Sequence, residues 1–226
     1  MILASNQPYF LPYFPYWQLI HAADRFLLGD DFAFIRKGWI NRNRIRMGGQ
    51  DILWFRVELR KASSFKLIRD TFLKEPVSVS DKLRTLETAY QKAPFFQDGY
   101  ALAERIFACP ESNLALFLEA SIREVCAYLD IDTPIVRTSS LEGNAALKRE
   151  RRIYDMCHRL GATHYINPIG GQALYSFEEF RRQGIRLSFL SGQASGAGNL
   201  SVLDAIMNHS RDELHAMLDQ YTFIDG

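Results

Sequence analysis

The sequence has little net charge and lacks long apolar runs. Its 226 residues carry 27 Lys and Arg against 26 Asp and Glu, which gives a formal net charge of +1. A dedicated nucleic-acid binder usually has a basic excess over its whole domain, so the neutral total argues against that class. No stretch approaches the roughly 18 uninterrupted apolar residues of a transmembrane helix. The first ten residues lack the basic start of a signal peptide, so we expect a cytoplasmic protein with no integral membrane segment.

Cysteines and histidines are few and widely scattered. Cys109, Cys126 and Cys157 suggest neither a disulfide framework nor a CxxC site, and we expect them to act as small hydrophobes. The five histidines show no HExxH or similar zinc spacing, and no GxSxG, GxGxxG or Walker motif occurs. The sequence therefore predicts no metal site of a known local pattern and identifies no cofactor.

Short apolar strands alternate with helices along the chain, which predicts an α/β fold. A strand at 1–5, a loop with three prolines, a helix at 16–23 and a strand at 25–29 favour a parallel pair. We expect one domain over residues 1–226, with a mostly parallel sheet, flanking helices and a helical insertion at about 80–130. Further strands are predicted at 52–59, 135–137, 163–166 and 185–190, and further helices at 80–92, 97–107, 113–129, 145–160, 177–183, 200–208 and 211–218.

An aromatic loop follows the first strand, and six of the nine residues from Tyr9 to Trp17 are aromatic. One interpretation is a packed loop that covers the end of the sheet. The other is one wall of a ligand site, because open α/β sheets bind ligands beyond the carboxyl ends of their strands. In that hypothesis Asn6 and Gln7 supply amide donors and acceptors, and the Tyr9 ring stacks on a base or a sugar.

A basic segment covers residues 36–46, where five Lys and Arg residues occur without an acid. A solvated surface is the simplest interpretation, but such surfaces usually mix both signs. Arg side chains bind phosphate or carboxylate through two parallel hydrogen bonds, so we predict a site for an anionic small molecule. Nucleic acid is less favoured because the segment is short and nothing elsewhere supports it. The predicted substrate-binding residues here are Lys37, Trp39, Asn41, Arg42, Asn43 and Arg44. Residues 30–49 are otherwise predicted to be irregular.

Three further features complete the predicted site. Asp30 and Asp31 follow the second strand and are the candidate catalytic residues, as a general base or Mg²⁺ ligand; ordering of the basic segment is the structural alternative. Adjacent residues of an extended chain point to opposite faces, so we do not expect them to share a proton. Gly170 follows a later strand, where glycine allows an anion to approach the backbone, and we count it as substrate-binding. Residues 191–199, rich in Ser and Gly, predict a mobile loop or a lid.

Motifs along nearly the whole chain resemble the WbqC-like protein family. The most distinctive is KGWINRNRI at 37–45, preceded by Gln7-Pro8-Tyr9 and by Asp30-Asp31. Weaker matching pieces are Pro12, Tyr16-Trp17, Ala23-Asp24, residues 90–96, Ser139-Ser140 with Lys148, residues 161–165 and residues 200–204. The family commonly has His before the Gln-Pro pair, where this chain has Asn6, so a general base at that position would be missing.

The resemblance also implies a function. Proteins of this family are bacterial and archaeal and are often linked to surface-polysaccharide (O-antigen) biosynthesis. It implies a transferase that modifies a nucleotide-linked or otherwise anionic sugar, by aminoacyl or acyl transfer. The alternative is a non-catalytic protein that binds the same anion or nucleotide sugar, and the absence of the His favours it.

Overall fold

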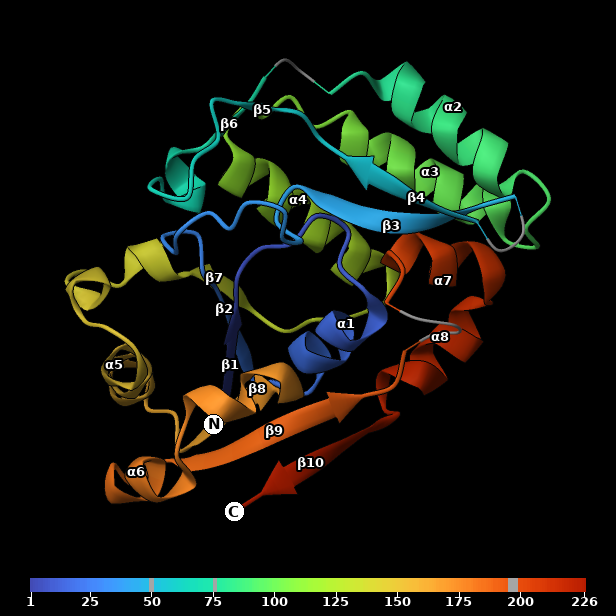
Figure 1. The fold of residues 1–226 in the computed structure, drawn as a ribbon. Coiled ribbons are helices and arrows are strands. Elements are labelled where there is room, and N and C mark those ends of the chain that lie inside the picture. Colours follow the sequence, from blue (N-terminus) through green and yellow to red (C-terminus); the bar gives the residue numbers. More distant parts are fainter. Residues whose placement is uncertain (49–50, 75–76, 195–198) are drawn as a thin grey trace.

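The computed structural model describes residues 1–48, 51–74, 77–194 and 199–226. Within them a six-stranded sheet with the order β10-β9-β8-β1-β2-β7 forms the centre of the molecule (Figure 1). Five of these strands run parallel, and β10 pairs antiparallel with β9 at one edge. The strands are β1 (Ile2–Asn6), β2 (Arg25–Leu28), β7 (Ile135–Arg137), β8 (His164–Pro168), β9 (Arg186–Gly192) and β10 (Tyr221–Asp225). The predicted α/β class with a mostly parallel sheet is confirmed.

Both faces of the parallel strands are buried, which explains their short apolar sequences. Leu3 packs into the cluster on one face of the sheet, and Ala4 packs into the cluster on the other. Ala4 lies in register with Phe26 of β2 and with Ile166 of β8, and all three are buried. A strand buried on both sides reads as a continuous apolar run because neither face meets water.

The order of the strands reverses between β1 and β8. Helix α1 (Phe14–His21) leads from β1 to β2, and the chain reaches β7 on the same side. It then returns through α5 (Glu150–Leu160) to β8, on the opposite side of β1. The 3-10 segment η4 (Ile169–Leu174) and helix α6 (Phe177–Arg182) connect β8 to β9. A crevice between carboxyl ends at such a reversal is the usual ligand position in open α/β sheets.

The chain between β2 and β7 builds a separate layer above the sheet in Figure 1. It contains α2 (Val79–Tyr90), α3 (Phe96–Phe107) and α4 (Leu114–Tyr128), together with the hairpin β3 (Arg42–Met47) and β4 (Asp51–Arg56). The short pair β5 (Leu59–Arg60) and β6 (Phe72–Leu73) and the turn η1 (Ile68–Asp70) complete it. Helices α7 (Val202–Asn208) and α8 (Arg211–Leu218) follow β9, and none of the helices in the described parts is long and apolar enough to cross a membrane.

Strand β3 corrects the prediction of an irregular basic segment. Asn43 and Ile45 point into the core and are fully buried, whereas Arg42, Arg44 and Arg46 alternate with them and are partly exposed. This is the two-residue period of a strand with one face in the core. The sequence did not reveal this alternation because Asn43, one of the inward residues, is polar.

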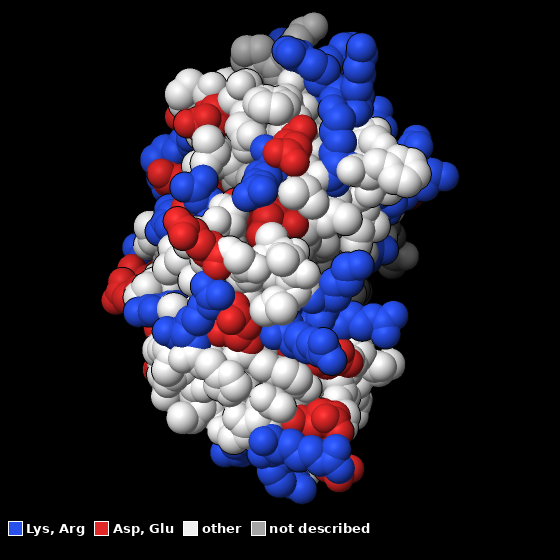
Figure 2. Space-filling view, turned by 90° about the vertical axis from the view of Figure 1, so that its left-hand side faces the viewer, with Lys and Arg blue, Asp and Glu red and all other residues white. Residues whose placement is uncertain are grey.

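Charge on the outer surface is mostly mixed. On the face that Figure 2 shows, Asp and Glu side chains lie between Lys and Arg over most of the area, while Lys and Arg gather along its right-hand border. Mixed signs of this kind are typical of a solvated surface and agree with the neutral total charge.

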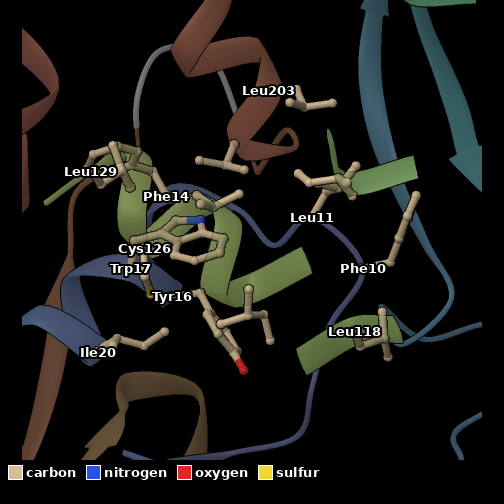
Figure 3. Packing of buried hydrophobic residues seen from close by; sticks show 14 of the residues in the cluster. Phe10, Leu11, Phe14, Tyr16, Trp17, Ile20, Leu118, Cys126, Leu129 and Leu203 are labelled. Atoms are coloured by element: carbon tan, nitrogen blue, oxygen red, sulfur yellow. The ribbon is translucent and has the colours of Figure 1, made fainter. Parts of the chain in front are cut away.

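Most of the aromatic loop lies in the main core. Phe10, Phe14, Tyr16 and Trp17 are buried, and Figure 3 shows them among apolar side chains that come from other elements, such as Leu118 and Leu203. The indole Nε1 of Trp17 donates to the carbonyl of Pro12 at 3.0 Å. Tyr9 and Tyr13 are only partly buried. The loop therefore fills the core with most of its rings and leaves two at the crevice.

Candidate functional site

Two neighbouring cavities lie at the crevice between β1 and β8. The first, which we call the tyrosine cavity, has a volume of about 390 Å³, and the second, the Asn199 cavity, has about 280 Å³. They share four residues, Asn6, Tyr13, Pro168 and Gly170. The other residues of the tyrosine cavity are Ser5, Gln7, Tyr9, Phe32, Ile35, Ile153, Tyr165, Asn167, Gly171, Leu174 and Tyr175. The other residues of the Asn199 cavity are Pro15, Tyr16, Ile169, Leu190, Gly192 and Asn199.

Hydroxyl groups line the floor of the tyrosine cavity because β1 and β8 end side by side. The Ser5 Oγ on β1 and the Tyr165 Oη on β8 are 2.8 Å apart. The Tyr165 ring stacks on Phe180 with 5.8 Å between centroids and meets the edge of Tyr175 at 6.2 Å. These contacts hold the Tyr165 hydroxyl in place, so the floor offers hydrogen-bonding groups at fixed positions.

Amide side chains form the polar part of the wall. The Asn6 Oδ1 accepts a hydrogen bond from the Gln7 backbone N–H at 2.8 Å, which directs the Asn6 Nδ2 donor away from the backbone. The Gln7 Nε2 donates to the carbonyl of Ala33 at 3.3 Å. Asn167 packs against Gly171 so closely that a Cβ there would lie 2.1 Å from its Nδ2. Glycine is therefore needed at 171 for Asn167 to keep this position.

The tyrosines at the crevice are protonated at neutral pH and can act as hydrogen-bond donors. Burial, with a smaller contribution from Tyr13, raises the pKa of Tyr9 to about 12. Burial also raises the pKa of Tyr13 and that of Tyr175 above the ordinary value for tyrosine. Their hydroxyls consequently stay protonated. Among the described residues, no Asp, Glu, His, Cys or Lys lines either cavity.

Arg44 and Trp39 lie beside the Asn199 cavity. The Arg44 Nη2 donates to the carbonyl of Asn199 at 3.0 Å, and its guanidinium lies 5.3 Å from the centroid of the Trp39 ring. The Trp39 ring meets the edge of Tyr13, which both cavities share, at 6.2 Å. The Arg44 Nε is buried and has no hydrogen-bond partner in the described parts of the chain. A cation with unused donors thus borders this cavity.

The other residues predicted from the basic segment do not line the cavities. The Nδ2 atoms of Asn41 and Asn43 donate to backbone carbonyls, of Val57 at 3.0 Å and of Leu11 at 2.7 Å. Arg42 stacks 4.1 Å over Trp54 and donates to the carbonyls of Lys37 and Gly38. Lys37 itself is exposed and has a φ of 61°. The Asn side chains of this motif therefore fix the backbone, and Arg44 with Trp39 connects it to the crevice.

Asp30 and Asp31 lie at the carboxyl ends of β2 and β7, where they form a closed polar network. The Thr138 hydroxyl is 2.5 Å from the Asp31 Oδ1 and 3.3 Å from the Asp30 Oδ1. Ser139 donates to Asp30 from its backbone N–H at 3.0 Å and from its hydroxyl at 2.6 Å. The expectation that the two carboxylates diverge is corrected, because residues 30 and 31 form a turn and both reach one hydroxyl. Neither lines a cavity.

A buried ion pair connects this network to the tyrosine cavity. The Arg152 Nη2 is 2.5 Å from the Asp31 Oδ1, and the two side chains are 12% and 1% exposed. The Arg152 guanidinium also lies 4.5 Å over the ring of Phe32, which lines the cavity. Through Arg152, Asp31 therefore supports the wall of the cavity from behind.

The structure places Asn6, Gln7, Tyr9 and Gly170 in the crevice, where the sequence analysis expected them. It adds Tyr13, Tyr165, Asn167 and Tyr175. Two of these had a signal, Tyr13 as part of the aromatic loop and Asn167 by its place directly before the Gly-containing loop. Of the predicted loop at 191–199, Ser191 and Gly192 end β9, and residues 195–198 lie outside the described residues.

Fold and crevice together define an open α/β protein with a polar crevice where its strand order reverses. The chain belongs to the WbqC-like protein family, whose family model matches residues 7–216. It is also similar to a protein of Mycobacterium tuberculosis named "Uncharacterized protein Rv1507c", with 26% identity over 189 residues, which cover 83% of this chain and 80% of that protein. No solved structure matches the chain.

Proposed function

We propose that this protein is a cytoplasmic transferase that modifies a nucleotide-linked or otherwise anionic sugar, by aminoacyl or acyl transfer, in bacterial surface-polysaccharide biosynthesis. The observation that carries the proposal is the tyrosine cavity, which lies at the β1–β8 reversal and is lined by hydroxyls, amides and aromatic rings. Membership of the WbqC-like family supports the polysaccharide role, because the resemblance implies it.

The lining of the tyrosine cavity has the chemistry that a sugar needs. A sugar hydroxyl both donates and accepts, and the amides of Asn6, Gln7 and Asn167 do the same. Tyrosine rings provide apolar faces together with a polar tip. Because their pKa values are raised, the phenols of Tyr9, Tyr13 and Tyr175 stay protonated and can donate hydrogen bonds, which would stabilise negative charge developing on a substrate oxygen.

The start of α1 supports binding of an anion in the Asn199 cavity, next to the tyrosine cavity. The N-cap residue Tyr13 has no capping side chain, and the first turn of α1 contains no acid. The positive end of the helix dipole therefore meets no negative side chain of the helix itself, and Arg44 lies beside the Asn199 cavity. In this proposal Asp30 and Asp31 position the wall through Arg152 and do not touch the substrate.

The second candidate is the non-catalytic binding protein. One observation favours it: no carboxylate, imidazole, thiol or amine lines the two cavities among the described residues, so a conventional general base is missing there. The two candidates predict the same ligands and differ in whether a product forms.

The test is a thermal-shift screen followed by a turnover assay. We would screen nucleotide-linked sugars, sugar phosphates and aminoacyl or acyl donors, since a ligand at 100 times its Kd stabilises by about 2.7 kcal/mol. Each hit would then be incubated with the protein and every donor, and the products analysed by mass spectrometry. A modified sugar supports the transferase, binding without product supports the binding protein, and the absence of any binding overturns both.

The assay has a matched pair of variants. Asn6→Ala removes an amide from the lining of both cavities, and Asn208→Ala removes an amide from the far end of α7. We expect the first to lose binding and the second to keep it. Equal binding by the two variants would place the ligand elsewhere.

A further inference from the structure

The two cavities adjoin each other at the residues that line both of them. Asn6 is the last residue of β1, Pro168 is the last residue of β8, and Tyr13 and Gly170 border the same place. Sites for drug-sized ligands have volumes of roughly 300–1,000 Å³. At about 390 Å³ the tyrosine cavity is at the low end of that range, and at about 280 Å³ the Asn199 cavity is just below it, so a nucleotide-linked sugar needs both.

We infer that the cavities bind two different parts of one substrate: an anionic, phosphate-bearing part in the Asn199 cavity and an uncharged, hydroxyl-bearing part in the tyrosine cavity, with their linking oxygen at Asn6. The inference rests on the proposed function and assigns an orientation to its substrate. Three observations on the lining of the cavities support this arrangement.

The first observation is that a cation with unused donors borders the Asn199 cavity alone. In the described parts of the chain the Arg44 side chain makes one hydrogen bond, to the Asn199 carbonyl, and no carboxylate lies within ion-pair distance of it. A guanidinium has five N–H donors; apart from the buried Nε–H and the one that bonds to Asn199, the donors on its Nη atoms remain for phosphate oxygens. Arg152, the cation that lies against Phe32 of the tyrosine cavity, is already paired with Asp31.

The second observation is that the tyrosine cavity is uncharged. Among the residues that the structure describes, serine, asparagine, glutamine and tyrosine provide all its polar side chains. Neutral groups of this kind bond to sugar hydroxyls without neutralising a charge, whereas an unpaired phosphate in the same place would remain without a counterion. The uncharged part of the substrate therefore fits here.

The third observation is the direction of the Asn6 amide. Its Oδ1 is held by the Gln7 N–H, and its Nδ2 has no hydrogen-bond partner among the described residues. Because Asn6 lines both cavities, this donor lies at their junction. It is placed to bond to an oxygen that connects the two parts of a ligand.

Two exposed residues on η4 allow each cavity to be blocked separately. Ile169 lines the Asn199 cavity alone and is 43% exposed, and Leu174 lines the tyrosine cavity alone and is 65% exposed. The variants Ile169→Trp and Leu174→Trp form a matched pair, since both add bulk at an exposed position of one segment. The probes are inorganic pyrophosphate and a panel of methyl glycosides, with binding followed by isothermal titration calorimetry or NMR.

We expect Ile169→Trp to weaken pyrophosphate binding at least tenfold and to leave glycoside binding unchanged, and Leu174→Trp to do the reverse. Arg44→Gln should behave like Ile169→Trp. Pyrophosphate and glycoside should also bind to the wild-type protein at the same time. The inference is overturned if pyrophosphate does not bind, if the two variants affect both probes equally, or if their effects are exchanged.

The same variants separate this inference from the proposed function. If nucleotide-linked sugars bind but Ile169→Trp does not weaken them, the orientation is wrong and the proposed function stands. If the two probes bind as described but no nucleotide-linked sugar does, the cavities are assigned correctly and the proposed substrate is wrong.

Discussion

The two halves of the carboxyl edge of the sheet differ in how their polar groups are used. At β2 and β7, Asp30, Asp31, Thr138 and Ser139 bond to one another, and Arg152 closes the network. At β1 and β8, Asn6, Asn167 and the tyrosines border open cavities instead. Both halves carry polar residues at or just after the carboxyl ends of parallel strands, so position alone does not distinguish them.

What distinguishes the halves is whether the polar groups are already satisfied. A buried carboxylate that accepts several hydrogen bonds and pairs with an Arg has little left for a substrate, and removing it leaves its buried partners unpaired, which is destabilising. Amides and hydroxyls that face a cavity keep their capacity for a ligand. We therefore expect substitutions in the β2–β7 half to change stability and those in the β1–β8 half to change binding.

The largest effect is expected from Asp31→Ala. It leaves the Arg152 guanidinium buried without its carboxylate, and breaking a buried pair in this way costs about 3–5 kcal/mol. Urea denaturation would measure it. Glu58→Ala, which removes the partner of Arg56 from an exposed pair, is the control and should cost less than about 1 kcal/mol. Equal losses of stability in the two variants would contradict the structural role that we assign to the β2–β7 half.

The next effect concerns alkaline pH and Tyr9. The pKa of Tyr9 rises from 10 in the unfolded chain to about 12 in the fold, so its contribution to stability is complete below pH 10 and is lost as the pH rises to about 12. A difference of two pKa units is worth about 2.7 kcal/mol. Tyr9→Phe should thus reduce the loss of stability between pH 10 and pH 12 in denaturant titrations. Parallel curves for the two proteins would show that Tyr9 is not held in a buried position.

Thr138→Val tests the centre of the closed network. The substitution keeps the shape and removes the hydroxyl that bonds to Asp31, which leaves a buried carboxylate oxygen with one donor fewer. We expect a loss of about 1–3 kcal/mol in chemical denaturation with ligand affinity unchanged. Ser140→Ala removes an exposed hydroxyl two residues away and should cost less. A loss of ligand affinity without a loss of stability would show that Thr138 acts in binding, as we expect of the residues at β1 and β8.

The smallest effect is expected from Tyr13→Phe. The Tyr13 hydroxyl has no partner among the described residues and borders both cavities, so its removal should leave the melting temperature nearly unchanged. Ligand affinity should fall about fivefold, the equivalent of one hydrogen bond of about 1 kcal/mol. Tyr221→Phe on β10 is the matched control and should bind normally. A stability loss in Tyr13→Phe would identify its hydroxyl as structural.

The arrangement of the main sheet could be predicted because its strands are short, apolar and separated by helices. Arg25–Leu28 and Ile135–Arg137 needed no knowledge of distant contacts. Strand β3 was missed because Asn43, a polar residue, fills a core position there, and its burial depends on two carbonyls 32 and 33 residues away. Strand β10 was missed because it has one partially buried face and only β9 as a neighbour.

The site residues also divide into those that local sequence predicts and those that depend on distant contacts. Asn6, Gln7 and Gly170 could be placed in the crevice because they lie at or just after the ends of strands. The role of Asp30 and Asp31 could not be predicted, because their partners Thr138 and Arg152 are more than 100 residues away in the sequence. Tyr165 and Tyr175 had no signal, since a tyrosine in a strand or beside a helix is usually part of a core.

The stacking of Arg on Trp beside the crevice also provides a built-in optical probe. Of the three tryptophans, Trp17 is buried in the core, while Trp39 and Trp54 lie with their rings 5.8 Å apart under Arg44 and Arg42. Indole emission responds to a nearby charge and to contact with water. An anion that draws Arg44 away from Trp39 would change the emission wavelength and intensity of the intrinsic tryptophan fluorescence, so binding can be followed without a label.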